Sequence, residues 1–538
     1  MWRLKFQSTC KIPSLNEMDE WLSQKSLRYE RSIILVLVCI MVYGIIFSAT
    51  TVSRHHAFMT GAWDLGIFTQ SLWTTLNANR FFYHTCELFI NPSGSFFGVH
   101  FSPILFLILP LYWISQTPET LLVLQSFILP LAAIPIYKLA RENAGGRVVG
   151  LVFALAYLTY PPIHYVNCYD FHVQAFLPLF FACTIYYVTK ENWPKYLLFL
   201  FLSLMCQENV AQIGVFIGVY IGWKYRGLIV RTVKMRKLTE KKILVPVATM
   251  ILSIAWYWIT VWQRNTFFPI NPQTIEAFLG SGNFEILGAK NPLEVPLLVV
   301  LRPWNAILAL TYDASTKILY MILIFGPLAL FSFKSASALI PTIPWFFFSL
   351  FSQCLVHHML GSHYEAYTVS FVFAAAIFGL RKSYLKTRDF KSIRRPLETI
   401  AVFSLVFFVT ATPLFPMIRV FPANYTPSHI GEHERLLDEV LDNVPSDASI
   451  LTQSNLFPHV SHRIDAYVIP SPWINSPIRN VTIEFINQTL DKVEYVLVDH
   501  KSDPAATAFV LSLLDTKTQF IQVACKDNGT ILLYKRQT

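Results

Sequence analysis

The chain has 538 residues, of which 54% are hydrophobic and only 14% are charged. A typical soluble domain carries about 25% charged residues, and a soluble protein of this length needs more polar surface than this composition supplies. The composition therefore excludes a purely soluble enzyme, a disordered chain and a disulfide-rich secreted module. It indicates a polytopic α-helical membrane protein that crosses the bilayer many times.

Apolar runs that suit spanning helices occur along the first 420 residues. Eleven such runs are predicted as spans: Ser32–Thr51, Thr120–Ala140, Val148–His164, Gln174–Thr189, Tyr196–Gln207, Val210–Trp223, Ile243–Trp262, Ile318–Phe333, Ala338–Val356, Tyr364–Leu380 and Thr399–Arg419. Two shorter stretches interrupted by proline, Phe101–Ile114 and Val295–Leu310, suit re-entrant or interfacial helices better than full crossings.

Lysine and arginine lie mostly on one side of this arrangement. With the N-terminus inside, the inner segments hold 27 of the 43 Lys and Arg residues, and the outer segments of the membrane domain hold 6. Positive charge keeps loops in the cytoplasm. We therefore expect a protein of the cell membrane whose N-terminus lies in the cytoplasm. The net charge of +10 therefore reflects the membrane topology, with some contact between basic residues and membrane lipids. It does not indicate that the protein binds nucleic acid.

Residues after about 420 have the composition of a soluble domain, and an odd number of spans places them outside the cytoplasm. All four N-x-[ST] sequons lie here, at Asn424, Asn480, Asn487 and Asn528, which favours an extracytoplasmic domain that carries glycans. Four strands and three helices are predicted, the strands at 449–452, 495–498, 520–524 and 530–534, and the helices at 432–441, 481–490 and 505–515. We expect a transmembrane domain at 1–421, with a first outer loop at 52–117, and a small α/β domain at 422–538.

Polar residues near the bilayer are informative because each is costly there. They gather in the outer loops, at Asp64, His100, Asp170, His172, Glu208 and His363. If Asp64, Asp170 and Glu208 converge, they form a carboxylate site that could bind a divalent cation, Mg²⁺ or Mn²⁺, or supply a general base. The three imidazoles could neutralise a phosphate or move a proton.

Several of these residues can also be explained without a role in binding or catalysis. Asp64 begins a helical pattern and could only cap it; Asp170 and His172 could be ordinary loop residues, and His100 could start an interfacial helix. Glu208 lies between two apolar runs with almost no loop, so simple solvation explains it less well. A disulfide between two outer-loop cysteines, Cys86 and Cys168, is left open. No Walker, GxSxG, HExxH or GxGxxG motif occurs, which disfavours an ATP-driven pump.

Short motifs follow one another along nearly the whole chain: Trp63–Trp73, His100–Pro103, Pro110–Tyr112, Asp170–His172, Gln207–Asn209, His363–Tyr364 and Phe457–Arg463. In this order they resemble a prokaryotic family of predicted membrane proteins of unknown function within the GT-C glycosyltransferase superfamily. The resemblance implies a GT-C-like membrane domain and transfer of a sugar from a polyprenyl-phosphate donor to an acceptor at the outer membrane face.

The resemblance also suggests roles for individual residues. Asp64 and His100 are the expected catalytic residues; Gln70, His172, His363 and Tyr364 are expected to bind substrate; Asp170 and Glu208 are the candidate metal ligands. The second loop pairs Asp170 with an imidazole where oligosaccharyltransferases of the superfamily have two acids, and no WWDYG-type motif follows, so protein N-glycosylation is not supported. The alternative is a non-catalytic transporter or structural subunit that handles lipid-linked glycans, which predicts polar residues along a path through both leaflets.

Overall fold

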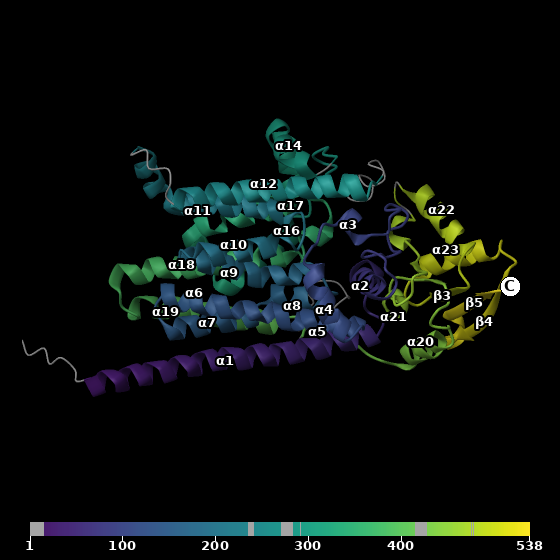
Figure 1. Ribbon diagram of the computed structural model, residues 1–538, viewed down its shortest axis with the longest axis horizontal. Helices are drawn as coiled ribbons and strands as arrows, with labels where there is room; N and C mark the ends of the chain where they lie inside the picture. Colours follow the sequence, from purple (N-terminus) through teal and green to yellow (C-terminus); the bar gives the residue numbers. More distant parts are fainter. Residues whose placement is uncertain are drawn as a thin grey trace, which may run out of the picture.

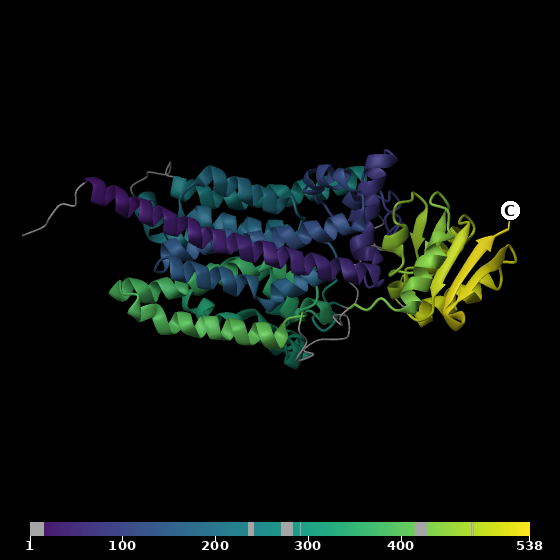
Figure 2. The ribbon, with the colours of Figure 1, turned by 90° about the horizontal axis from the view of Figure 1, so that it is seen from below.

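The computed structural model describes residues 15–234, 241–270, 283–290, 292–414, 428–474, 476 and 478–537, with side chains from residue 31 onward except 232–234. A bundle of helices runs along the long axis of the molecule, and a smaller α/β domain lies at one end of it (Figure 1). The longest helix, α1 (Leu15–His56), follows one side of the bundle and crosses its face when seen from below (Figure 2). Helix α2 (Ile67–Asn77) lies between the bundle and the α/β domain.

The bundle contains short and long helices. The remaining ones are α3 (Phe96–Val99), α4 (Leu105–Ile114), α5 (Pro118–Ile128), α6 (Ala133–Asn143), α7 (Arg147–Leu158), α8 (Pro161–Cys168), α9 (Leu177–Thr189), α10 (Trp193–Leu204), α11 (Val210–Lys234), α12 (Lys241–Phe267), α14 (Val295–Leu301), α15 (Pro303–Thr311), α16 (Ala314–Phe325), α17 (Ile343–Phe351), α18 (Val369–Thr387) and α19 (Lys391–Ala411). Helix α11 packs along α12, α6 along α7, and α1 along α5.

The predicted number of eleven spans is not confirmed. Among the described residues, four helical stretches are long and apolar enough to cross a membrane, Arg31–His56, Pro118–Asn143, Val210–Arg231 and Lys241–Phe267, and three bent helix pairs raise the number to at most seven. The predicted span Tyr196–Gln207 shows the reason. It falls on α10, whose 12 residues extend roughly 18 Å, less than the ~30 Å of a bilayer core.

Both stretches that were expected to be re-entrant or interfacial contain short helices. Phe101–Ile114 contains the 10-residue helix α4. Val295–Leu310 contains α14 and α15, which meet at Pro303 with a bend of 118°. Proline has no N–H to continue the first helix and ends it there.

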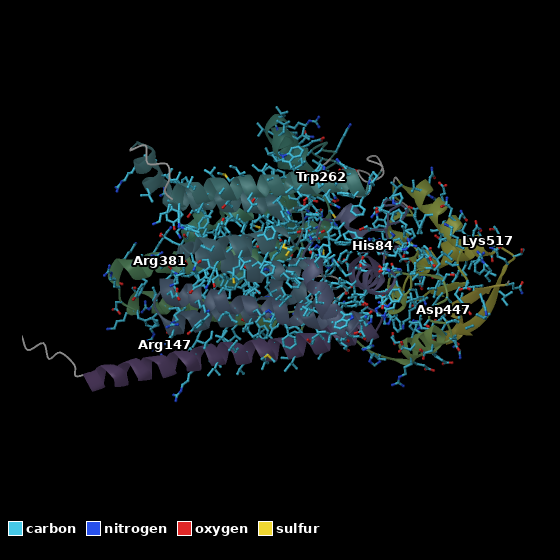
Figure 3. All side chains as sticks on the ribbon, viewed as in Figure 1. His84, Arg147, Trp262, Arg381, Asp447 and Lys517 are labelled. Atoms are coloured by element: carbon cyan, nitrogen blue, oxygen red, sulfur yellow. The ribbon has the colours of Figure 1, made fainter. Side chains whose placement is uncertain are left out.

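The two ends of the bundle differ in charge, as the counts of Lys and Arg predicted. Arg147 and Arg381 lie at the end farthest from the α/β domain, whereas His84 lies near that domain (Figure 3). The outer loops that carry Asp64, Asp170 and Glu208 follow α1, α8 and α10 respectively. The cytoplasmic side of the membrane stays a prediction, but the polar loops and the basic loops are at opposite ends.

The α/β domain contains a five-stranded sheet in the order β2-β1-β3-β5-β4. Strand β1 pairs in parallel with β2 and β3, and β5 pairs antiparallel with β3 and β4. The elements are α20 (Glu432–Asp442), β1 (Ile450–Thr452), α21 (Phe457–Val460), β2 (Ala466–Val468), α22 (Arg479–Leu490), β3 (Tyr495–Asp499), α23 (Pro504–Leu514), β4 (Phe520–Lys526) and β5 (Ile531–Arg536). Four predicted strands and three predicted helices are confirmed, and β2, only three residues long, was missed.

Three of the four sequons lie on described parts of this domain. Asn480 and Asn528 are exposed and Asn487 is partly buried, whereas Asn424 and the predicted domain boundary at 421/422 lie outside the described residues. In the membrane domain, Cys86 and Cys168 are free thiols, so the disulfide that the sequence left open does not form.

Candidate active site

Asp64 lies in a single widened turn between α1 and α2. This π-helical turn, η1 (Ala62–Gly66), follows the extended residue Gly61. Turns of this type are rare and often occur at functional sites. The side chain of Asp64 keeps 24% of its surface exposed, so its carboxylate is accessible from outside the protein.

Two side chains of the second outer loop hold the Asp64 carboxylate. His172 Nε2 lies 3.0 Å from Asp64 Oδ1, and the Tyr169 hydroxyl donates a hydrogen bond to Asp64 Oδ2 at 3.0 Å. Each oxygen of the carboxylate therefore has its own partner. The pair of contacts fixes the orientation of the Asp64 carboxylate.

A second carboxylate lies beside the first. Asp170 Oδ2 accepts the N–H of Gly61 at 2.5 Å. A Cβ added to Gly61 would stand 3.7 Å from Asp170 Oδ2 and 3.9 Å from Asp64 Oδ2, so both carboxylates face one glycine. Burial, and next the nearby charge of Asp64, raise the pKa of Asp170 to about 7. The two acids therefore differ in environment: Asp64 is accessible, whereas Asp170 is buried and holds a proton up to near neutral pH.

Gln125 orders the loop that carries these partners. Its buried side-chain amide donates to the carbonyl oxygens of the 166–170 segment, at 3.0 Å for Tyr169 and 3.3 Å for Asp170. Its Oε1 accepts the N–H of His172 at 3.0 Å. Buried backbone groups need such partners, so one side chain of α5 fixes the whole loop. This residue was not predicted from the sequence, although an amide inside a predicted apolar span is a signal that could have found it.

The predicted substrate-binding residues His172, His363 and Tyr364 come together. The rings of His172 and His363 stack with centroids 3.9 Å apart, and the His363 ring lies 4.2 Å from that of Tyr364. Burial, and next the neighbouring His172, hold the pKa of His363 well below its usual value. His363 is therefore neutral, and its ring extends the aromatic wall beside Asp64.

His100 and Glu208 form a second, adjacent cluster. His100 Nδ1 lies 2.9 Å from Glu208 Oε1, and Glu208 Oε2 accepts the N–H of Phe101 at 3.1 Å. Burial alone would lower the pKa of His100, but the charge and hydrogen bond of Glu208 outweigh it and raise that pKa. The Phe96 ring contacts His100 and also Phe68, which contacts His172. The two clusters are thus neighbours.

A third pair, His84 and Glu87, lies in the first outer loop and was not predicted to have a role. The two side chains are buried and approach to 3.6 Å. Neither His84 nitrogen, nor Glu87 Oε2, has a hydrogen-bond partner among the described residues. Burial raises the pKa of Glu87 to about 7 and lowers that of His84 to about 3. Buried polar atoms without a hydrogen-bond partner, such as these three, are unusual in folded proteins.

Gln70, expected to bind substrate, has another position. Its Nε2 donates to the carbonyl oxygens of Arg463 and Ala466 at 3.0 and 3.2 Å, and its Oε1 accepts the Thr85 N–H at 2.8 Å. The amide is therefore fully engaged between the first outer loop and the α/β domain. Gln70 therefore joins the two domains, and its expected role in substrate binding stays a prediction.

The two candidate metal ligands, Asp170 and Glu208, have different partners. Within the described ranges, no group of three or more His, Cys, Asp and Glu residues is arranged to hold a metal ion. Glu208 already uses both oxygens for His100 and Phe101. Their role as ligands of a divalent cation stays a prediction.

Comparison with solved structures identifies the class of this fold. The structure is similar to the crystal structure of ArnT from Cupriavidus metallidurans bound to undecaprenyl phosphate, with a TM-score of 0.50, 9% sequence identity, and coverage of 93% of this chain and 97% of that chain. This likeness shows an ArnT-like polytopic membrane fold.

The family of this chain follows from its sequence. The chain belongs to the family described as predicted membrane protein (DUF2079), which matches residues 54–532. A search of curated proteins finds no match. The matched range includes the turn of Asp64, the second outer loop and nearly all of the α/β domain.

Proposed function

We propose that this membrane protein is a glycosyltransferase that moves a sugar from a polyprenyl-phosphate donor to an acceptor at the outer membrane face. The observation that carries the proposal is the accessible carboxylate of Asp64, held by His172 and Tyr169 beside the buried Asp170. This site lies where an ArnT-like bundle meets its α/β domain, and the ArnT structure contains a bound polyprenyl phosphate.

The chemistry that suits this site is an inverting transfer. Asp64 takes the proton of the acceptor hydroxyl, and the acceptor oxygen bonds to the anomeric carbon of the donor sugar. The bond from that carbon to the lipid phosphate breaks, and the phosphate leaves with both electrons. Inversion requires the base and the leaving group on opposite faces of the sugar, so the donor phosphate would lie across the sugar from Asp64.

His100 is suited to stabilise the negative charge of the leaving phosphate. A phosphate needs charge stabilisation more than protonation when it leaves. Glu208 keeps the pKa of His100 raised, which favours the imidazolium near neutral pH. His172 and His363 would line the sugar between the base and the phosphate.

The test is complementation of a deletion strain, because this experiment works whichever acceptor the protein uses. Mass spectrometry should detect a surface glycan that lacks one sugar in the deletion strain and regains it with the wild-type gene. Asp64→Asn should fail to restore it, since an amide cannot take the proton. Asp313→Asn is the matched control, because Asp313 also faces a histidine, His358, at 3.3 Å, outside this site.

The same strains separate this function from transport or a structural role. Restoration of the glycan by Asp64→Asn to the wild-type level would reject Asp64 as the base. With purified protein in nanodiscs, transfer from a short-chain polyprenyl-phosphate sugar supports an enzyme. Movement of the intact lipid between leaflets without sugar transfer supports a transporter.

A further inference from the structure

The turn that carries Asp64 is held from two sides. On the membrane-domain side, Asp170 accepts the N–H of Gly61. On the other side, Ser454 Oγ of the α/β domain accepts the N–H of Ala62 at 3.0 Å. These are the amides that immediately precede and begin η1, where backbone N–H groups have no partner inside the helix.

Ser454 reaches the turn because of its place in the sheet. It lies two residues beyond β1, at the carboxyl end of a strand that pairs in parallel on both sides. Loops at the carboxyl ends of parallel strands commonly carry functional residues in open α/β sheets. Here that end of the sheet faces the membrane domain, and Trp473, beyond β2, contacts Trp63 with ring centroids 4.9 Å apart.

The side chains of Ser454, Asp170 and Asp64 surround the same point. A Cβ added to Gly61 would stand 3.4 Å from Ser454 Oγ, closer than either carboxylate oxygen. Ala62 is fully buried, so its N–H depends on Ser454 for a hydrogen bond. Loss of that acceptor leaves a buried donor unsatisfied, which the turn can relieve only by shifting.

Other contacts dock the two domains without touching the turn amides. Thr69 Oγ1 lies 2.8 Å from Ser461 Oγ, and Gln70 bonds to the chain next to β2. A Cβ on Gly66 would stand 2.6 Å from the Phe457 ring, so the end of η1 and α21 pack closely there. The α/β domain therefore sits firmly enough for Ser454 to act as a fixed acceptor.

We propose that Ser454 is a positioning residue for the transfer reaction and that the α/β domain sets the geometry of Asp64 through it. This inference rests on the proposed function. Ser454 touches no reacting atom; it fixes the backbone two residues before the base. The domain is thus part of the catalytic machinery, in addition to covering the outer end of the bundle.

The test compares Ser454→Ala with Ser461→Ala in the purified full chain. Both variants lose one serine hydroxyl from the same domain contact, but only the first removes the acceptor of Ala62 N–H. We expect Ser454→Ala to lower kcat about tenfold with the donor KM unchanged, and Ser461→Ala to leave kcat unchanged. Ser454→Thr, which keeps the hydroxyl, should restore most of kcat.

Hydrogen–deuterium exchange gives a readout that does not depend on activity. In Ser454→Ala, the peptide that covers Gly61–Gly66 should exchange faster than in the wild type and in Ser461→Ala. Wild-type exchange and wild-type kcat in Ser454→Ala would overturn the proposal. Equal loss of kcat in both serine variants would also overturn it, because general loosening of the domain would then be the cause. Faster exchange in Ser454→Ala, combined with a wild-type protein that transfers no sugar, would reject the proposed function and retain Ser454 as the residue that holds the turn.

Discussion

His172 Nε2 lies 3.0 Å from Asp64 Oδ1, and the ring of His363 stacks on the His172 ring with centroids 3.9 Å apart. Asp64, the proposed base, therefore has a partner whose own position is fixed, since Gln125 also holds the His172 N–H. Such support keeps a catalytic carboxylate in one orientation before the substrate arrives.

Removal of the His172 imidazole should slow transfer. A hydrogen bond to a charged group contributes about 1.5–3 kcal/mol, so His172→Asn should lower kcat by about 10- to 100-fold. Initial rates with a polyprenyl-phosphate sugar measure the effect. His358→Asn, which removes the histidine of the Asp313 pair, is the control and should transfer at the wild-type rate. A kcat of His172→Asn within twofold of the wild type would contradict this role.

Asp170 should make stability depend on pH. Its pKa is about 7 in the folded protein because of burial and the charge of Asp64, against a usual value of 3.8. The folded state therefore binds the proton more tightly than the unfolded state, and this contribution is complete below about pH 4 and lost as the pH rises through about 7. The melting temperature of the wild type should fall over that range, and that of Asp170→Asn should fall much less.

The same experiment with Asp64→Asn identifies the cause. Without the neighbouring negative charge, the pKa of Asp170 in the folded protein should decrease, so the fall in melting temperature should be smaller and should end at a lower pH than in the wild type. Identical pH profiles in the wild type and Asp170→Asn would show that another group is responsible.

Glu208 should control the pH range in which His100 is charged. Glu208→Gln keeps an oxygen for the Phe101 N–H but removes the charge that raises the pKa of His100. Burial then lowers that pKa, so the imidazolium is lost at a lower pH. The basic limb of the rate profile should move to lower pH, and the rate at pH 7 should decrease. A basic limb at the wild-type position would exclude His100 as the titrating group.

Substitution of Gln125 should affect sugar transfer more than it affects the packing of the helix bundle. Gln125→Leu has a similar volume but leaves the carbonyls of the second outer loop and the His172 N–H without their partner, at about 1–3 kcal/mol for each buried group that stays unsatisfied. We expect loss of transfer and faster hydrogen exchange in residues 166–174. Gln125→Glu, which keeps an acceptor for the His172 N–H, should be less affected. Full activity in Gln125→Leu would contradict the role of this amide.

Much of the site could be predicted because a membrane limits where polar residues can lie. Asp64, the pair Asp170 and His172, and His363 occur in three separate outer loops, and a common end of the bundle brings them together. The strands of the α/β domain could be predicted as well, because their short apolar runs are separated by helical patterns and turn residues. The spans could not be counted reliably, since broken and short helices such as α10 have the same composition as full crossings.

The contacts between domains could not be predicted from the sequence. Gln70 and Ser454 are ordinary polar residues of a loop region and a strand end, and their roles depend on how the two domains dock. Hydropathy and spacing describe one segment at a time, so they carry no information about which surface a segment meets. This is why the contacts that Gln70 and Ser454 make across the domains were not predicted.

The hydrogen bond between Ala62 and Ser454 joins positions 392 residues apart. At a synthesis rate of about 5–20 residues per second, Ser454 follows Ala62 by roughly 20–80 s. During that interval the first outer loop already carries Asp64, but the turn lacks its second anchor. A partly made chain therefore lacks the complete turn, which forms only when the last domain has folded against the bundle.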